Sequence, residues 1–391
     1  MQNAIDVLWE NFYYTKPLTF WEFVREFKSL KSLFPCVKDA LKRFDESTKM
    51  LSTYPSEIYV QGAVGIGKGV YCYLVFLYRV YLFLLLKEPH KLMSWSPSAE
   101  IGAVVIGPKS DETLKGIVNF IQSAESNIFG IGHEYENNDK KVVSEIVWST
   151  KDKNAVDLWL EKGLDGRFYF KAKNGNKLVF EAVKHQGALI GLQPAVSYFE
   201  SDDYDLYCSL VKRVNTRFGL QNKALFSTII VDKFPNNLYS DLLDQTIKEK
   251  EKEANVLVER FVYYFYKNVE NEEFWKGKHD YMIDPDTGKV ERKDAEDVEG
   301  LNWICFPGVY KSSTGDMNLY EMAKKNPEAF IKDILGLPLT TPLSKEYKVT
   351  DELSALQTVR KLIKDYHIKI TYGNDGMYLA IDEVNTKIKV Y

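Results

Sequence analysis

One stretch constrains the fold of this chain more than any other: "EIYVQGAVGIGKGVYCYLVFLYRVYLFLLL", residues 57–86. It reads as a short apolar strand, a glycine-rich loop, a lysine and a long apolar helix. The loop fits the pattern G-x-x-x-x-G-K through Gly62, Ala63, Val64, Gly65, Ile66, Gly67 and Lys68. Backbone N–H groups of such a loop surround phosphate oxygens, the helix dipole adds positive potential, and the lysine reaches the β- and γ-phosphates. The stretch therefore predicts a nucleotide-phosphate site, and the alternative is a glycine-rich turn that binds nothing.

The position after the lysine departs from this pattern, because Gly69 stands where a serine or threonine hydroxyl usually binds Mg²⁺. Losing one charge-assisted ligand costs about 1.5–3 kcal/mol. Mg²⁺ commonly keeps several water ligands, so a water molecule can take the empty place. We therefore expect residues 62–69 to bind ATP with Mg²⁺, and we expect hydrolysis to suffer more than binding.

An ATP-hydrolysing loop of this type also needs a carboxylate at the end of a neighbouring strand. The stretch "AVSYFESDDYD", residues 195–205, is the best candidate, since Glu200 directly follows an apolar run. We predict that Glu200 orients the attacking water and that Asp202 is the metal partner, or the base if the strand runs longer. Phe199 occupies the first place of the usual Asp-Glu pair. The alternative is that these acids only favour the dipole at the start of the next helix.

Strand and helix patterns alternate along the first two thirds of the chain. Apolar strand patterns at residues 57–61, 103–106, 195–199 and 226–231 are each followed by a helical pattern. This alternation predicts an α/β fold with a mostly parallel sheet of the P-loop NTPase type, flanked by helices. Asn174-Gly175 lies between two alternating runs and predicts a hairpin. Ser110 and Thr113 are expected to cap the helix that follows residue 106.

At 391 residues the chain is too long for a single ordinary core, so we expect several parts. They are a helical N-terminal region (residues 1–55), a P-loop ATPase core (56–256), a lid or linker subdomain (257–342) and a small C-terminal α+β segment (343–391). The last segment is expected to hold a helix over residues 351–365 and two strands joined by a turn at residues 373–376. We expect no complete nuclease domain after residue 342.

Composition excludes several classes of function. The net charge of −4 offers no global attraction for nucleic acid, so DNA would need a local patch. Lys212, Arg213 and Arg217 are one candidate patch, and a solvated basic face is the other interpretation. The four cysteines form no CxxC pair, which argues against a zinc site or a disulfide framework. The apolar run at residues 70–86 contains Arg79 and is shorter than the roughly 20 residues of a membrane-spanning helix, so we expect no membrane partner.

Five segments, taken in order, resemble the large terminase subunit of tailed bacteriophages, the DNA-packaging motor. "EIYVQGAVGIGKG" is similar to the first ATPase motif of that family, and "GAVVIGPKSDETLKGIVNFI" to its second strand and helix. "HQGALIGLQPAVSYFESDDYDLYCSLVKRVNTRF" resembles its Walker B region, and "ALFSTIIVDKFPNN" its coupling strand, although Lys233 replaces the small hydroxyl residue expected there. "NPEAFIKDILGLPLTTP" is similar to its closing segment through Phe330, Asp333, Gly336 and Pro338.

This resemblance implies a motor ATPase that moves double-stranded DNA into procapsids in the cytoplasm of an infected bacterial host. It implies a portal protein and a small terminase subunit as partners and a homo-oligomeric ring on the portal. It also implies either a nuclease supplied by a separate chain or DNA cutting by other means. Three departures, Gly69, Phe199 and Lys233, put efficient hydrolysis in question. The alternatives are a degenerate nucleotide-binding or scaffolding relative and another kind of P-loop NTPase.

Overall fold

A computed structural model describes residues 10–27, 33, 35–63, 67–124, 126–147, 158–201, 203–233, 242–261, 280–285, 287–292, 303–312, 315–337, 369–373 and 376–380. The chain divides into two compact units. The first comprises Met1–Phe234 and Ile247–Phe274, and the second comprises Pro235–Thr246 and Trp275–Tyr391. Each unit is described by itself below.

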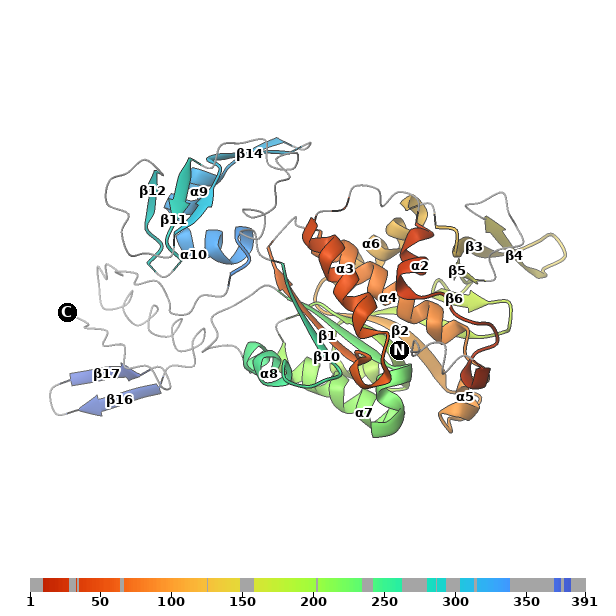
Figure 1. The fold of residues 1–391 in the computed structure, drawn as a ribbon. Helices are drawn as coiled ribbons and strands as arrows, with labels where there is room; N and C mark the ends of the chain where they lie inside the picture. Colours follow the sequence, from red (N-terminus) through yellow and green to blue (C-terminus); the bar gives the residue numbers. More distant parts are fainter. Residues whose placement is uncertain are drawn as a thin grey trace. The chain divides into compact units, whose positions relative to one another are not determined.

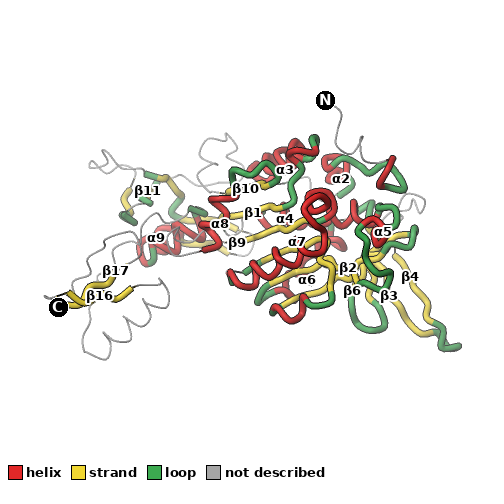
Figure 2. Tube along the Cα trace, turned by 90° about the horizontal axis from the view of Figure 1, so that it is seen from below, coloured by secondary structure: helices red, strands yellow, loops and turns green. Residues whose placement is uncertain are grey.

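A ten-stranded sheet forms the centre of the first unit, with the strand order β10-β1-β9-β8-β2-β7-β6-β5-β3-β4 (Figure 1). The first five strands in this order are all parallel to their neighbours. They are β10 (Val256–Phe261), β1 (Glu57–Gly62), β9 (Thr228–Lys233), β8 (Leu192–Phe199) and β2 (Glu100–Ile106). Figure 2 shows β1 and β9 side by side. The predicted α/β fold with a mostly parallel sheet flanked by helices is confirmed. Because β10 pairs with β1, the sheet extends past residue 256, where the core was expected to end.

The other five strands extend the sheet in a mixed arrangement. They are β7 (Lys177–Val183), β6 (Phe168–Ala172), β5 (Leu158–Lys162), β3 (Phe129–Glu136) and β4 (Val142–Val147). The predicted hairpin at Asn174-Gly175 is confirmed, since β6 and β7 pair antiparallel around it. The sequence did not predict β3, β4 or β5. Of these, β4 has no buried residue, and its sequence VVSEIV does not alternate between apolar and polar residues, so no pattern of period two marked it as a strand.

Helix α4 (Lys68–Leu84) is the core helix of this unit and crosses the sheet. Fourteen of its residues are buried, which explains its apolar composition all round. Arg79 is 4% exposed, and its Nη2 donates a hydrogen bond to the Ser227 carbonyl at 3.0 Å. Its guanidinium also lies 4.7 Å from the centre of the Tyr54 ring. The described helices include none long and apolar enough to cross a membrane.

Further helices cover both faces of the sheet (Figure 1). Helices α2 (Phe20–Arg25), α3 (Pro35–Ser47) and α6 (Ser110–Ser123) lie on the α4 side, and α7 (Tyr204–Phe226) packs on the other side against β8 and β9. Aromatic rings join the N-terminal helices to α4; Phe20, for example, lies 5.1 Å from Tyr78. The expected helical N-terminal region is therefore confirmed for the described residues. Shorter elements are α5 (Pro89–Leu92), η2 (Leu51–Thr53), η3 (Gln186–Leu189) and α8 (Leu242–Lys250).

An ion pair between the half-exposed Arg43 and the buried Glu259 ties α3 to the edge strand β10. Arg43 Nε donates to both carboxylate oxygens of Glu259, at 3.1 and 3.0 Å, and the Glu259 side chain is 2% exposed. Burial raises the pKa of Glu259, and the hydrogen bonds and charge of Arg43 act against that shift.

Replacing Arg43 by methionine should destabilise the protein by about 2 kcal/mol at neutral pH, because the buried Glu259 carboxylate loses its partner, while solvent at the half-exposed position 43 screens part of the effect. The variant's folded-state pKa at Glu259 should rise further above the unfolded value. The destabilisation should therefore be full above that raised pKa and should shrink as pH falls through it. Urea unfolding at several pH values measures this. Lys49→Met is the control, since the Lys49–Glu46 pair is exposed and its loss should leave the free energy of unfolding nearly unchanged.

The described part of the second unit contains three small sheets and short helices. One sheet has the order β12-β11-β13, and the pairs β14-β15 and β16-β17 form hairpins. The bounds are β11 (Tyr281–Ile283), β12 (Val290–Arg292), β13 (Ile304–Phe306), β14 (Val309–Ser312), β15 (Gly315–Asn318), β16 (Lys369–Gly373), β17 (Gly376–Ala380), α9 (Leu319–Lys325), α10 (Pro327–Ala329) and the π-turn η5 (Phe330–Ile334). The hairpin expected around residues 373–376 is confirmed. The helix expected over 351–365 lies outside the described residues.

Candidate nucleotide site

The candidate site lies where parallel strands β1, β9, β8 and β2 end, because their carboxyl ends share one edge of the sheet. β1 ends at Gly62, and α4 begins at Lys68 after the glycine loop. A Cβ at Gly62 would lie 2.4 Å from the Phe261 carbonyl oxygen, so only glycine fits against β10 there. Gly67, with φ of 87°, turns the chain into the helix in the left-handed region. Ala63 is buried, and Val64, Gly65 and Ile66 lie outside the described residues.

Lys68 forms a buried ion pair with Asp232, the next-to-last residue of β9. The two residues are 9% and 6% exposed. The register Val60↔Asp232 places the aspartate beside β1, directly under the start of α4. Tyr198 of β8 donates its O–H to Asp232 Oδ2 at 2.5 Å, and Cys72 of α4 lies 3.9 Å from the same oxygen. The lysine expected to bind phosphate is thus held next to a carboxylate.

Glu200 directly follows β8, the strand next to β9 in the sheet. Its backbone N–H donates to the Ile106 carbonyl at 2.8 Å, and its side chain accepts a hydrogen bond from the Thr113 hydroxyl of α6. A Cβ at Gly107 would lie 2.1 Å from the Glu200 carbonyl oxygen, so glycine at 107 allows this close approach. Burial raises the pKa of Glu200 and the nearby Asp232 charge adds to the shift, while Thr113 and Lys68 act in the opposite direction. A half-buried carboxylate of raised pKa is suited to accept a proton from water.

The structure changes two interpretations made from the sequence. The helix-capping role belongs to Asp203, whose Oδ1 accepts from the Leu206 N–H at 2.9 Å, so capping does not explain Glu200. The prediction that Thr113 caps α6 is wrong, because its hydroxyl faces Glu200. The other expected cap, Ser110, is buried without a hydrogen-bond partner, and Lys109 at the N-cap makes no side-chain capping bond.

Replacing Thr113 by valine should shift the acidic limb of the pH–rate profile to higher pH. The Thr113 hydrogen bond lowers the pKa of Glu200, so its loss raises that pKa and leaves less of the ionised base at a given acidic pH. The measurement is kcat/KM for ATP between pH 5 and 9. Thr113→Ser keeps a hydroxyl and is expected to leave the limb in place; an unmoved limb in the valine variant would show that Glu200 is not the titrating base.

Asp232 is the site residue that sequence reasoning missed as a functional group. Its signal was the same as that of Glu200, a carboxylate at the end of an apolar run, here residues 228–231. The register Phe199↔Val231 shows that Glu200 and Asp232 follow neighbouring parallel strands. Two carboxylates and Lys68 therefore meet at one edge. Asp202, the predicted metal partner, lies outside the described residues.

The donor set fits a nucleotide triphosphate accompanied by a cation. Gly62 and Gly67 shape the loop between β1 and α4, and Lys68 supplies the positive charge next to it. A Cβ at Gly69 would have nothing within 4 Å, so the place of the usual hydroxyl is open space. Within the described part of the chain, no three His, Cys, Asp or Glu side chains are grouped so as to hold a metal ion. A Mg²⁺ ion here would need phosphate oxygens and water in addition to protein carboxylates.

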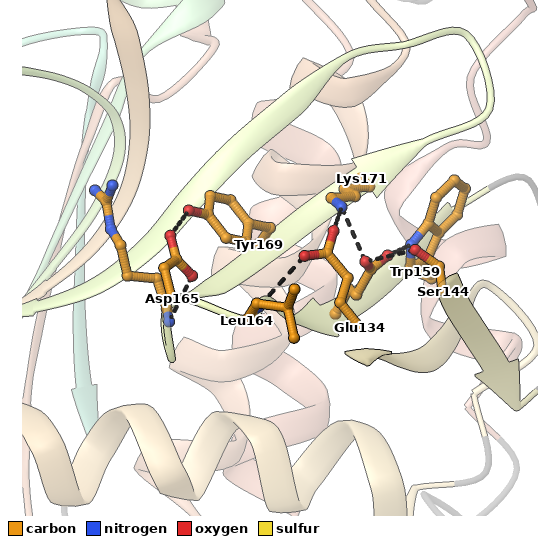
Figure 3. Close-up of polar contacts among 9 residues, drawn as sticks. Glu134, Ser144, Trp159, Leu164, Asp165, Tyr169 and Lys171 are labelled. Carbon is orange, nitrogen blue, oxygen red and sulfur yellow. Dashed lines mark hydrogen bonds and ion pairs between the residues drawn. The ribbon is translucent and has the colours of Figure 1, made fainter. Parts of the chain in front are cut away.

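A second polar cluster lies far along the sheet, on β3 to β6 (Figure 3). Lys171 Nζ lies 2.8 Å from Glu134 and 2.9 Å from Glu161, which is 1% exposed. Glu161 also accepts from the Ser144 hydroxyl at 2.9 Å and from Trp159 Nε1 at 2.5 Å. Burial raises the pKa of Glu161, but these hydrogen bonds, led by Lys171, lower it overall. The donors and acceptors satisfy one another, so this cluster stabilises the strand extension.

The basic residues of α7 show one structural role. Arg213 Nε donates to the Leu192 carbonyl at 3.1 Å, which fixes α7 against the start of β8. Burial lowers the pKa of Arg213, and the neighbouring Arg217 adds to this shift. The Arg217 carbonyl accepts from Trp95 Nε1 at 3.1 Å. These contacts account for Arg213 as an anchor of the helix, and the role of the patch toward DNA stays a prediction.

Comparisons with known proteins give likeness at the level of structure only. No family model matches the sequence, and no curated protein matches it. A solved structure of the large terminase from the thermophilic bacteriophage D6E is similar over 78% of this chain and 54% of that chain, with 10% identity and a TM-score of 0.38. The structure of that terminase in complex with ATP-gamma-S is similar over 78% of this chain and 53% of the terminase chain, with 11% identity and a TM-score of 0.38. The S. cerevisiae protein dbp5, bound to nup159, gle1, ip6 and ADP, covers 58% and 52% at 12% identity and a TM-score of 0.25.

This chain spans about half the length of the terminase chains in the first two of these matches. At such identities and TM-scores the likeness does not establish what this chain binds or does. The functional interpretation therefore depends on the site itself.

Proposed function

We propose that this protein is an ATP-binding motor subunit of the large terminase type, which couples ATP hydrolysis to packaging of double-stranded DNA into procapsids. The observation that carries the proposal is the meeting of Lys68 and Glu200 at one sheet edge. Lys68 begins a helix directly after a glycine loop, and Glu200 directly follows β8, which is two positions from β1 in the sheet order. The motif order along the sequence, which resembles that of large terminases, supports the same interpretation.

In this proposal the chain's own groups divide the work. Loop N–H groups and Lys68 bind the phosphates, and Glu200 accepts a proton from the attacking water. Thr113 and Gly107 hold Glu200 in position through a hydrogen bond and a close backbone approach. A bound Mg²⁺ ion would neutralise phosphate charge, and the carboxylates of this edge are the groups that would face it. The proposed partners are double-stranded DNA, a portal protein, a small terminase subunit, further copies of this chain in a ring, and a separate nuclease chain.

The second candidate is a relative that binds nucleotide without efficient turnover. It is favoured by Gly69, which supplies no oxygen, and by the ion pair that holds Lys68 on Asp232. One experiment separates the candidates: phosphate release by the purified protein with ATP and Mg²⁺, with and without double-stranded DNA. Turnover that DNA stimulates supports the motor, whereas tight nucleotide binding without turnover supports the second candidate. Turnover that DNA leaves unchanged would point to another kind of P-loop NTPase.

A further inference from the structure

Asp232 occupies a place that the proposed function does not explain by itself. Its carboxylate is almost fully buried and is shared between Lys68 and the Tyr198 hydroxyl. The two buried charges compensate each other in this structure, and a ligand that takes Lys68 would leave the Asp232 carboxylate without that compensation. Its position beside the phosphate-binding lysine suggests that its charge acts on the ligand.

The strands show why this carboxylate, and not one from β8, reaches the lysine. Successive side chains of a strand point to opposite faces. Tyr198 points to the α4 side, where its ring lies 6.1 Å from Tyr73, and Phe199 points to the α7 side, 5.8 Å from Tyr207. An acid at position 199 would therefore face away from Lys68. Asp232, on the strand between β1 and β8, faces Lys68 instead.

We propose that Asp232 makes nucleotide binding depend on a divalent cation. In the nucleotide-free protein it neutralises Lys68. When a triphosphate takes over the lysine, the Asp232 carboxylate is left close to the phosphates and beside Glu200, and like charges at this distance repel in a site of low dielectric. A cation between carboxylate and phosphate removes that repulsion. This inference rests on the proposed function, because it requires the loop to bind nucleotide phosphates.

The physical consequence is a difference between two affinities. Metal-free ATP must displace Asp232 from Lys68, and the Asp232 carboxylate then repels its phosphates. When ATP carries Mg²⁺, the same carboxylate attracts the metal ion. Removing the charge should therefore help metal-free ATP and should reduce the benefit of Mg²⁺. A loss of one charge-assisted interaction corresponds to roughly a tenfold change in affinity or more.

The test measures binding of an N-methylanthraniloyl-ATP probe by fluorescence, in Mg²⁺ and in EDTA. For Asp232→Asn we expect tighter binding in EDTA, and a ratio of the two affinities that falls at least about tenfold from the wild-type ratio. Tyr198→Phe is the matched control, since it removes a hydrogen bond to Asp232 but keeps the charge, and it should keep the wild-type ratio. Circular dichroism verifies folding. If Asp232→Asn does not fold, Asp232→Ser gives the same neutral comparison with a hydroxyl that accepts from Tyr198.

The outcomes separate this inference from the proposed function. If wild type binds the probe and the neutral variant keeps the wild-type ratio, the role of Asp232 is overturned and nucleotide binding stands. The same conclusion follows if Tyr198→Phe lowers the ratio as much as Asp232→Asn, since position and not charge would then matter. If wild type binds the probe in neither condition, both proposals fail together.

Discussion

Replacement of Glu200 by glutamine is expected to lower ATP turnover by about 10²–10⁴-fold while nucleotide affinity stays within a few-fold of wild type. The amide has nearly the same shape and still accepts the Thr113 hydrogen bond, but it cannot accept a proton from water. Because Glu200 lies beyond β8 and not in the glycine loop, the phosphate-binding groups are untouched. The measurement is steady-state phosphate release at saturating ATP and Mg²⁺.

A control variant on the same helix as Thr113 makes this result specific. Glu112→Gln changes an exposed acid in the first turn of α6 and should leave turnover unchanged. Turnover in Glu200→Gln that equals wild type would remove Glu200 from the chemistry. Asp202, the other carboxylate that the sequence predicts as a base, would then be the candidate.

The second large effect is expected at Gly69. Gly69→Ser should raise Mg²⁺-dependent turnover by about tenfold or more, because it restores a hydroxyl ligand worth about 1.5–3 kcal/mol and each 1.36 kcal/mol changes a rate tenfold. The structure allows the change, since a Cβ at this position meets no atom within 4 Å. The gain should appear with Mg²⁺ and vanish in EDTA, where no metal is present for the hydroxyl to bind.

Gly69→Ala is the matched control for this gain. Alanine also removes a glycine from the first turn of α4 and should stabilise that helix by up to about 1 kcal/mol, but it supplies no oxygen. Equal turnover in the serine and alanine variants would mean that helix stability, and not metal ligation, limits the enzyme. No gain in either variant would mean that water already fills the ligand position adequately.

The glycine loop between β1 and α4 and the carboxylate after β8 could be placed from the sequence because their signals are local. A glycine pattern between an apolar strand and an apolar helix reports backbone shape, and Glu200 ends an apolar run. Both features depend on residues close together in the chain. Asp232 has the same local signal as Glu200, but only the strand order β1-β9-β8 shows that it lies beside Lys68.

Two features differ from the prediction because residues far away in the chain provide their hydrogen-bond partners. The sequence predicts Thr113 as a helix cap, because its position near the start of α6 favours capping. In the structure the Glu200 carboxylate, 87 residues away in the chain, accepts its hydrogen bond instead. The sequence also does not predict strands β3 to β5. Their apolar pattern is weak, and pairing with neighbouring strands makes these segments form strands.

The sequence alone determined the alternation of strands and helices, the burial of α4 and the place of the glycine loop between β1 and α4, because spacing of apolar residues and glycines acts through neighbouring residues. The tertiary structure decided which charges meet there. Lys68 and Asp232 are 164 residues apart in the chain, and they are brought together only when β9 inserts between β1 and β8. Strand order depends on how the buried faces of the strands and the helices that connect them pack together, and no local pattern of side chains records it.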